Sequence, residues 1–240
     1  MPTRHARGFA SRSTLLVIVA AFAAGLGLYA AQRWFPSAGR APGETPAGQA
    51  VGPGSTAGAP ALAPVPGLKA VRLIEPARAV ADFALPLADG SQATPATLAG
   101  HWTVVFLGFT HCPDVCPTTL AELAKAQAQW RALPEATRPK LLFVSVDPGR
   151  DSVQGVGEYT RFFAPDTLAA APREAQLAPF AQALGLVYMK VPGAGDDYEM
   201  DHSATLVVLD PQGREAGLIR PPLAWADIAA DLAALAKARP

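Results

Sequence analysis

Residues 102–109 (WTVVFLGF) run directly into residues 110–117 (THCPDVCP). The first segment is an uninterrupted apolar run, which is typical of a strand buried on both faces of a sheet. The second segment holds both cysteines of the chain and leads into a helix, because Pro117 suits a first helical turn and apolar residues then recur near helical spacing up to Pro134. Since α/β folds bind ligands at the carboxyl ends of their strands, this loop is the first candidate for a functional site.

Strand and helix signals alternate through the rest of residues 67–240. Further strands are predicted at 83–87, 140–146, 187–191, 203–209 and 216–219, and helices at 153–163, 174–184 and 223–238. Within the first of these helices, Tyr159, Phe162 and Phe163 recur at helical spacing and are expected to face the core. The turn at 210–213 (DPQG) predicts an antiparallel hairpin near the end. The order predicts an α/β domain in which helices cover both sides of a sheet.

The composition excludes several classes of protein. Twenty basic residues against twenty acidic ones give no basic face, so nucleic-acid binding is not expected. Two cysteines and four histidines are too few for a multi-bridge disulfide scaffold or a four-cysteine zinc site. Any cysteine chemistry therefore depends on one pair.

The first 66 residues differ from the rest. Residues 1–14 contain Arg4, Arg7 and Arg12 and are expected to form a cytoplasmic tail, because positive charge favours the inner side of a membrane. Residues 15–35 begin with an uncharged apolar run and are predicted to be a single transmembrane anchor. A cleaved secretory signal is the alternative, and both interpretations place the domain outside the cytoplasm. Residues 36–66, rich in Pro, Gly and Ala, are predicted to be a disordered tether.

Cys112 and Cys116 have a spacing that suits a shared site. Residues four apart at the start of a helix can point their sulfurs to one side, within the range of a disulfide or a common metal ion. The amino terminus of a helix also favours thiolate over thiol. Two buried structural cysteines are the plainer alternative, which the surrounding prolines and Asp114 disfavour.

A third metal ligand is sought among the three histidines that lie outside the amino-terminal tail. His101 is interpreted as a loop residue, and His111 should point away from its neighbour Cys112 in an extended loop. His202 lies just before the apolar residues 204–209, so its loop would face the cysteines if that strand neighbours residues 102–109. His202 is therefore the preferred third ligand.

Other polar residues near these motifs receive structural interpretations. Met200 is expected to pack rather than to bind metal, and Asp114 and Asp201 are interpreted as solvated or capping carboxylates. Asp147 and Asp151 follow the predicted strand 140–146, where a turn needs polar neighbours.

Three motifs carry a resemblance to a known family. Residues 110–117 (THCPDVCP), 145–151 (SVDPGRD) and 201–204 (DHSA) resemble the SCO/SenC family of cytochrome oxidase assembly proteins. The resemblance implies a thioredoxin-like fold with a central mixed sheet flanked by helices. It also implies copper ligation by Cys112, Cys116 and His202. The implied role is delivery of copper to the binuclear centre of cytochrome c oxidase subunit II, or reduction of that centre's cysteines.

Ligand chemistry agrees with copper. Two thiolates and one imidazole suit Cu(I), whereas a structural zinc site would take a fourth ligand. Whether Cu(I), Cu(II) or both are carried stays open. The expectation is a metallochaperone rather than an enzyme, held by a single-pass helix in a bacterial inner membrane with its domain in the periplasm.

Two other functions use the same cysteines. A membrane-tethered thiol:disulfide oxidoreductase would use Cys112 and Cys116 as a redox pair without metal, and a thiol-disulfide reductant partner would restore it. Redox thioredoxins, however, place two residues between their cysteines, and this chain has three. A thiol peroxidase is a third alternative, but no activated peroxidatic setting is evident.

Overall fold

The computed structural model describes residues 67–193 and 197–238, which belong to one compact unit. The tail, anchor and tether predicted for residues 1–66 lie outside the described residues. None of the helices within the two described ranges combines the length and the apolar character needed to cross a bilayer.

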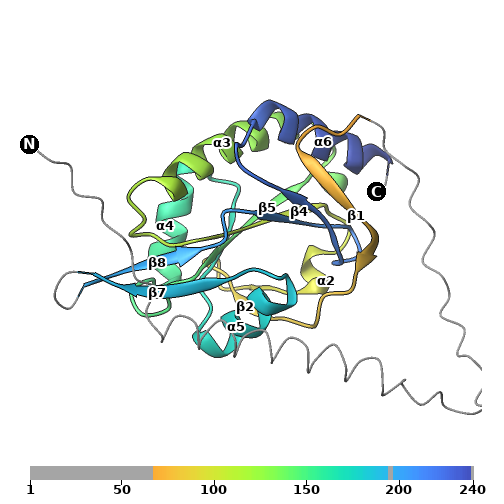
Figure 1. Cartoon of the computed structure of the whole chain (residues 1–240). Helices are drawn as coiled ribbons and strands as arrows, with labels where there is room; N and C mark the ends of the chain where they lie inside the picture. Colours follow the sequence, from red (N-terminus) through yellow and green to blue (C-terminus); the bar gives the residue numbers. More distant parts are fainter. Residues whose placement is uncertain (1–66, 194–196, 239–240) are drawn as a thin grey trace, which may run out of the picture. The chain divides into compact units, whose positions relative to one another are not determined.

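Six strands form the central sheet in the order β1-β10-β9-β4-β5-β6 (Figure 1). The parallel strands are β4 (Thr103–Gly108), β5 (Lys140–Ser145) and β6 (Leu168–Ala170). Antiparallel pairing joins β4 to β9 (Leu206–Leu209), β9 to β10 (Glu215–Ile219) and β10 to β1 (Val71–Arg78). The sheet is therefore mixed, as the resemblance implied.

The burial of the strands explains this arrangement. Every residue of β4 is buried, as are all residues of β5 but the first, so the two apolar runs occupy the middle of the sheet. A parallel pair needs a crossover, and α3 (Val115–Trp130) provides it. At the turn between β9 and β10, the Asp210 carboxylate accepts hydrogen bonds from the backbone N–H groups of Gln212 and Arg214. The predicted antiparallel hairpin is thereby confirmed.

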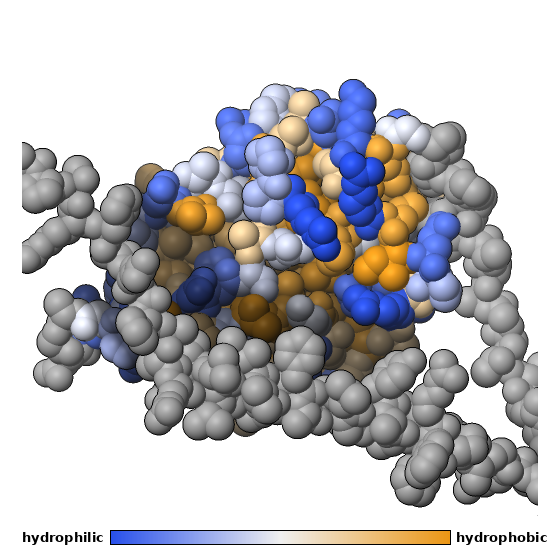
Figure 2. Space-filling model, viewed as in Figure 1, coloured by the Kyte–Doolittle hydropathy of each residue, from blue (hydrophilic) through white to orange (hydrophobic). Residues whose placement is uncertain are grey.

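Helices lie on both sides of the sheet (Figure 1). The side with α3 also carries α6 (Trp225–Ala238), and the indole Nε1 of Trp130 donates to the carbonyl oxygen of Ala229 at 3.2 Å. The other side carries α2 (Pro95–Leu98) and α5 (Glu174–Ala183), while α4 (Val153–Phe163) packs against β6. A short 3-10 turn, η1 (Glu135–Thr137), follows α3. Figure 2 shows hydrophilic side chains scattered among apolar ones on the viewed face.

Some elements differ from the prediction. The expected strand at 83–87 shortens to β2 (Leu85–Pro86), which pairs with β3 (Gln92–Ala93), and β1 and β6 were not predicted. Tyr159 and Phe163 pack against the core as expected, but the prediction for Phe162 is wrong because its side chain is 81% exposed. Phe162 lies on the outer face of α4 and contacts only the edge of the Phe163 ring among the aromatic side chains that the structure describes.

A separate hairpin lies outside the central sheet. It consists of β7 (Tyr188–Pro192) and β8 (Tyr198–His202), which pair only with each other among the described strands (Figure 1). Along β8, partly buried and exposed side chains alternate, so Tyr198, Met200 and His202 share one face of the hairpin. His202 thus ends a strand that the sequence had suggested was a loop.

Candidate metal centre

The cysteine loop is a tight turn between β4 and α3. The backbone N–H of Cys112 donates to the carbonyl oxygen of Phe109 at 3.3 Å, and Cys112 is partly buried. Cys116 is the second residue of α3 and is fully buried. Its N–H donates to the sulfur of Cys112 at 3.3 Å. The sulfur of Cys112 therefore satisfies an amide at the helix start, where the side chain of the N-cap residue Asp114 makes no capping bond.

A buried carboxylate anchors this loop to the sheet. Asp151 accepts hydrogen bonds from the backbone N–H of Thr110 at 3.1 Å and from its hydroxyl at 2.6 Å. It also accepts one from the hydroxyl of Ser145, at the end of β5, at 2.6 Å. These three bonds tie the start of the cysteine loop to the neighbouring strand, so the structural role predicted for Asp151 is confirmed.

Gly108 makes room for Cys116 at the end of β4. A Cβ atom at this position would lie 2.6 Å from Cε2 of Phe143 and 3.2 Å from Sγ of Cys116. The absence of a side chain therefore lets the buried sulfur pack directly over the strand.

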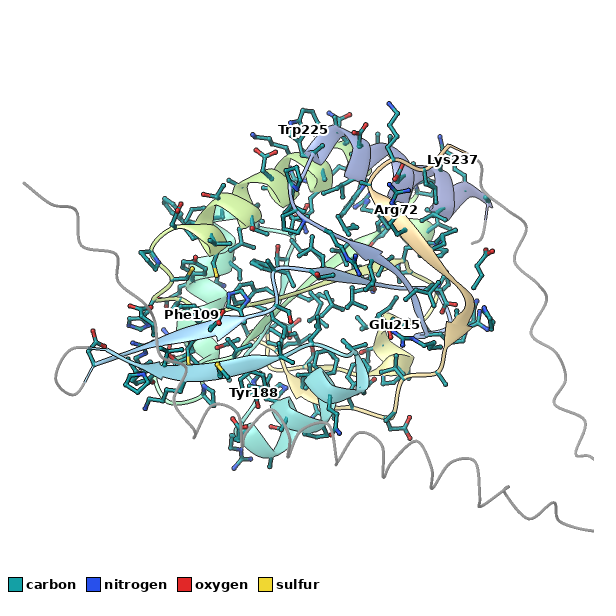
Figure 3. The ribbon with its side chains drawn as sticks, viewed as in Figure 1. Arg72, Phe109, Tyr188, Glu215, Trp225 and Lys237 are labelled. Carbon is teal, nitrogen blue, oxygen red and sulfur yellow. The ribbon has the colours of Figure 1, made fainter. Side chains whose placement is uncertain are left out.

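His202 lies against the buried cysteine. Because β9 runs antiparallel to β4, the chain that enters β9 lies near the carboxyl end of β4, as the sequence interpretation required. Nε2 of His202 lies 3.6 Å from Sγ of Cys116. The imidazole packs edge-on against Phe106 and Phe109, with ring centroids 6.3 Å and 6.0 Å apart. Figure 3 labels Phe109 beside the hairpin.

The hydrogen bonds of His202 define its tautomer. Nδ1 lies 3.2 Å from the carbonyl oxygen of Ser203. A carbonyl oxygen only accepts, so a hydrogen bond there places the ring proton on Nδ1 and leaves the lone pair of Nε2 directed to Cys116. Burial lowers the pKa of His202 below its ordinary value, which favours the neutral imidazole needed by a metal ligand.

The thiol of Cys116 behaves differently from the prediction. Burial raises its pKa well above the ordinary value, and the contact with the Cys112 thiol acts in the same direction. The expected preference for thiolate at the helix start is therefore wrong for Cys116 in the metal-free chain, because desolvation outweighs the effect of the helix terminus. A bound cation reverses this balance, since a coordinated thiol loses its proton.

The remaining candidates interact with other partners or are exposed. Nδ1 of His101 lies 2.9 Å from the carbonyl oxygen of Arg138, which confirms a loop role. The side chain of His111 is 54% exposed, and its Nδ1 lies 3.1 Å from the hydroxyl of Thr110. Met200 packs against the core, and Asp201 is exposed.

Of the three expected ligands, the structure places Cys112 beside Cys116 and Cys116 beside His202, but it does not gather all three around one point. Cys116 contacts His202 through its side chain, and it contacts Cys112 through both its amide and its thiol. Within the described residues, no three His, Cys, Asp or Glu side chains are already gathered as a complete metal site. Cys112 is less enclosed than Cys116, because it lies on the turn ahead of the helix.

Three contributors to this region were missed by the sequence interpretation. Phe109 contacts the His202 ring, and the guanidinium of Arg150 lies 3.7 Å from the centre of the Tyr198 ring. A single aromatic or arginine beside a motif is a weak signal. Their roles become visible only in the folded structure, where the hairpin contacts the loop between β5 and α4.

Together, the fold and the side chains define a class of protein. An α/β domain that presents two cysteines at the end of a central strand, with an imidazole against the buried one, is a thiol-based metal-binding or redox domain. The SCO1/SenC family model matches residues 71–237. The chain belongs to the SCO1/SenC family.

Individual relatives agree. The Arabidopsis thaliana protein named "Protein SCO1 homolog 1, mitochondrial" is 35% identical over 130 residues, which are 54% of this chain and 39% of that protein. This chain thus spans well under two thirds of that relative's length. The structure of Bradyrhizobium japonicum ScoI with copper bound is 32% identical, with a TM-score of 0.59, over 64% of this chain and 97% of that chain. Arabidopsis ScoI with copper bound is 29% identical, with a TM-score of 0.60, over 66% of this chain and 98% of that chain. These likenesses confirm the thioredoxin-like fold.

Proposed function

We propose that this chain is a copper metallochaperone that serves the binuclear copper centre of cytochrome c oxidase subunit II. Family membership supports a role in oxidase assembly, and the copper-bound ScoI structures support the metal. The observation that carries the proposal is the 3.6 Å separation between Sγ of Cys116 and Nε2 of His202. With metal–ligand bonds like those of zinc, about 2.3 Å to sulfur and about 2.0 Å to nitrogen, an ion held by three ligands at about 120° would separate these atoms by about 3.7 Å.

Cys112 completes the proposed ligand set. Its sulfur already faces the amide of Cys116, and it is less enclosed than Cys116. Two thiolates and one neutral imidazole form a soft, three-coordinate site that suits Cu(I). An incoming thiolate from the target can then approach the ion beside the less enclosed Cys112, and the ion passes by stepwise ligand exchange without being released into water.

A metal-free thiol:disulfide oxidoreductase is less well supported. The position beside the buried thiol is occupied by an imidazole whose lone pair points at sulfur, which is an arrangement for ligation. Redox thioredoxins also place two residues between their cysteines, and this chain has three.

The proposed location rests on the sequence. The apolar segment within residues 15–35 would anchor the chain in a bacterial inner membrane, and residues 36–66 would tether the domain in the periplasm. A domain of subunit II exposed to the periplasm would then be reached without crossing the bilayer.

The direct test is copper binding by residues 67–240 and their variants. The reduced domain should bind about one copper ion per chain, and Cys112→Ser, Cys116→Ser and His202→Ala should each lose most of it. His111→Ala is the matched control, because this histidine adjoins Cys112 but its Nδ1 lies 3.1 Å from the Thr110 hydroxyl and 3.6 Å from the Asp151 carboxylate. Retention of copper by His202→Ala together with its loss in His111→Ala would overturn the ligand assignment.

A second experiment separates delivery from reduction. The copper-loaded domain is mixed with the reduced, metal-free soluble domain of subunit II, and copper is followed on both proteins after separation. Transfer is expected when the acceptor's cysteines are already reduced. A domain that only reduces an oxidised acceptor and never transfers copper would instead be the oxidoreductase.

A further inference from the structure

The β7–β8 hairpin carries His202 but has no hydrogen bonds to the strands of the central sheet among its described strand pairs. Side chains therefore help to set where it lies, together with the three-residue connection from β8 to β9. At its base, Ser203 and Val187 are joined by two hydrogen bonds: the N–H of Val187 donates to the Ser203 hydroxyl at 3.0 Å, and the N–H of Ser203 donates to the Val187 carbonyl at 2.9 Å. These bonds hold the base of the hairpin to itself.

Three residues hold its far end to the domain. The guanidinium of Arg150, on the loop between β5 and α4, lies 3.7 Å from the centre of the Tyr198 ring, and its Nη1 donates to the Tyr198 carbonyl oxygen at 2.8 Å. The Tyr198 hydroxyl donates to Asp147 at 2.7 Å, and Asp147 also pairs with Nε of Arg150. We call Asp147, Arg150 and Tyr198 the Arg150 clamp.

The contacts of the Arg150 clamp hold the Tyr198 side chain in one orientation. Tyr198 is held by its ring, its hydroxyl and its carbonyl oxygen at once, and Lys190 of β7 places its Nζ 3.5 Å from the same ring. Arginine makes such combined contacts because its planar fork stacks and donates in fixed directions, which lysine does not do.

Two routes connect the clamp to His202. Tyr198 and His202 lie on the same face of β8, at its two ends, so fixing Tyr198 fixes the strand that presents the imidazole. The Arg150 guanidinium also lies 6.0 Å from the centre of the Phe109 ring, and that ring packs edge-on against His202. Phe109 is in turn the residue whose carbonyl oxygen accepts from Cys112.

From this arrangement we infer that the Arg150 clamp positions His202 as a copper ligand and thereby sets how tightly the chain holds its cargo. This inference rests on the proposed function. Arg150 and Tyr198 are positioning residues that act through β8 and Phe109 and do not touch the metal themselves. Residues that orient a metal ligand typically contribute a factor of about 10 to 100 in affinity.

The first test is the copper affinity of the full chain, in mild detergent, measured by competition with a Cu(I) chelator. Tyr198→Ala and Arg150→Lys should each weaken affinity by about 10-fold or more. Tyr198→Phe keeps the ring and the carbonyl contact, so it should stay within a few-fold of wild type. Glu199→Ala, an exposed neighbour on the same strand, is the matched control and should have no effect. Wild-type affinity in both Tyr198→Ala and Arg150→Lys would overturn the clamp.

A double-mutant cycle distinguishes positioning from general support of the fold. Once His202→Ala has removed the imidazole, adding Tyr198→Ala should cost no further copper affinity. If the two effects add in full, Tyr198 acts on the site independently of His202 and the inference is wrong.

A metal-free measurement separates failure of this inference from failure of the proposed function. Amide hydrogen exchange in residues 199–202 of the apo chain should be faster in Tyr198→Ala than in wild type, with β4 unchanged. A wild-type chain that binds no copper would refute the proposed function, yet this exchange result would still support or refute the clamp's hold on the hairpin.

Discussion

The cysteine loop and the β7–β8 hairpin approach the same site but are held in different ways. The loop extends from a fully buried central strand, and the buried carboxylate of Asp151 bonds both the backbone and the side chain of Thr110. The hairpin pairs only with itself among the described strands, and its contacts with the domain include partly exposed side chains. The thiols are thus positioned by the buried core of the domain. The imidazole is instead positioned by a hairpin whose contacts with the domain include partly exposed side chains.

This difference suits a protein that must release what it binds. Elements held by few, partly exposed contacts open at lower free energy than elements of the core. We therefore expect the hairpin to be the part that yields when a target thiolate displaces the ligands. The cysteine loop should keep its shape throughout.

The largest effect is expected from Asp151→Ala. The substitution removes the acceptor of three hydrogen bonds from Thr110 and Ser145, and it leaves buried donors without a partner. We expect the free energy of unfolding to fall by about 3 kcal/mol, measured by urea denaturation.

A second carboxylate provides the control for this variant. Asp166→Ala removes an exposed carboxylate paired with the exposed Arg131, and it should change stability little. Equal effects of Asp151→Ala and Asp166→Ala would show that the cysteine loop is not anchored by Asp151.

Gly108→Ala tests the packing of the buried thiol. The added methyl group would lie 2.6 Å from the Phe143 ring and 3.2 Å from Sγ of Cys116, so the ring and the sulfur must shift. Overpacking of this kind costs about 1 to 3 kcal/mol of stability. In Gly108→Ala combined with Cys116→Ala, the cost should shrink. If the loss of stability is as large without the Cys116 sulfur, the added methyl group clashes only with the Phe143 ring.

The strands that place the cysteine loop could be predicted from the sequence because their burial is complete. Residues 102–109 and 140–146 contain β4 and β5, since a strand buried on both faces leaves an unbroken apolar run. Helix α4 matches the predicted 153–163 because most of its apolar residues, with the exception of Phe162, follow one helical face. The pairing of β9 with β4, on which the choice of His202 depended, is confirmed.

The hairpin was harder to predict, for physical reasons. The second strand, β8 (YEMDH), carries four ionisable side chains among its five residues, and neither of its faces is fully buried, so it lacks a strand signal. The Arg150 clamp joins residues about 48 positions apart in the chain, and no local pattern reveals such a contact. The raised pKa of Cys116 depends on burial, which spacing alone does not show.

Acid should loosen the hairpin if Asp147 secures it through Tyr198 and Arg150. Burial acts to raise the pKa of Asp147, but hydrogen bonds from Arg150 and Tyr198 outweigh it and hold the pKa below its ordinary value. A depressed pKa in the folded state means that this stabilisation is complete above about pH 4 and is lost as pH falls through the folded value. The stability difference between wild type and Asp147→Asn should therefore shrink between pH 6 and pH 3. A constant difference over that range would contradict the assignment.

The smallest effect is expected at the hairpin's base, from Ser203→Ala. The substitution removes the hydroxyl that accepts from the N–H of Val187, but it keeps the backbone bond from Ser203 to the Val187 carbonyl. Because the donor is exposed, water can replace the lost acceptor, and global stability should fall by less than about 1 kcal/mol. The effect should instead be local: amide exchange should accelerate at Val187 and in β8, while β4 and α3 keep the wild-type rates. If β4 exchanges faster by the same factor, the hairpin and the cysteine loop open as one unit, and the contrast between a fixed pair of thiols and a movable imidazole is wrong.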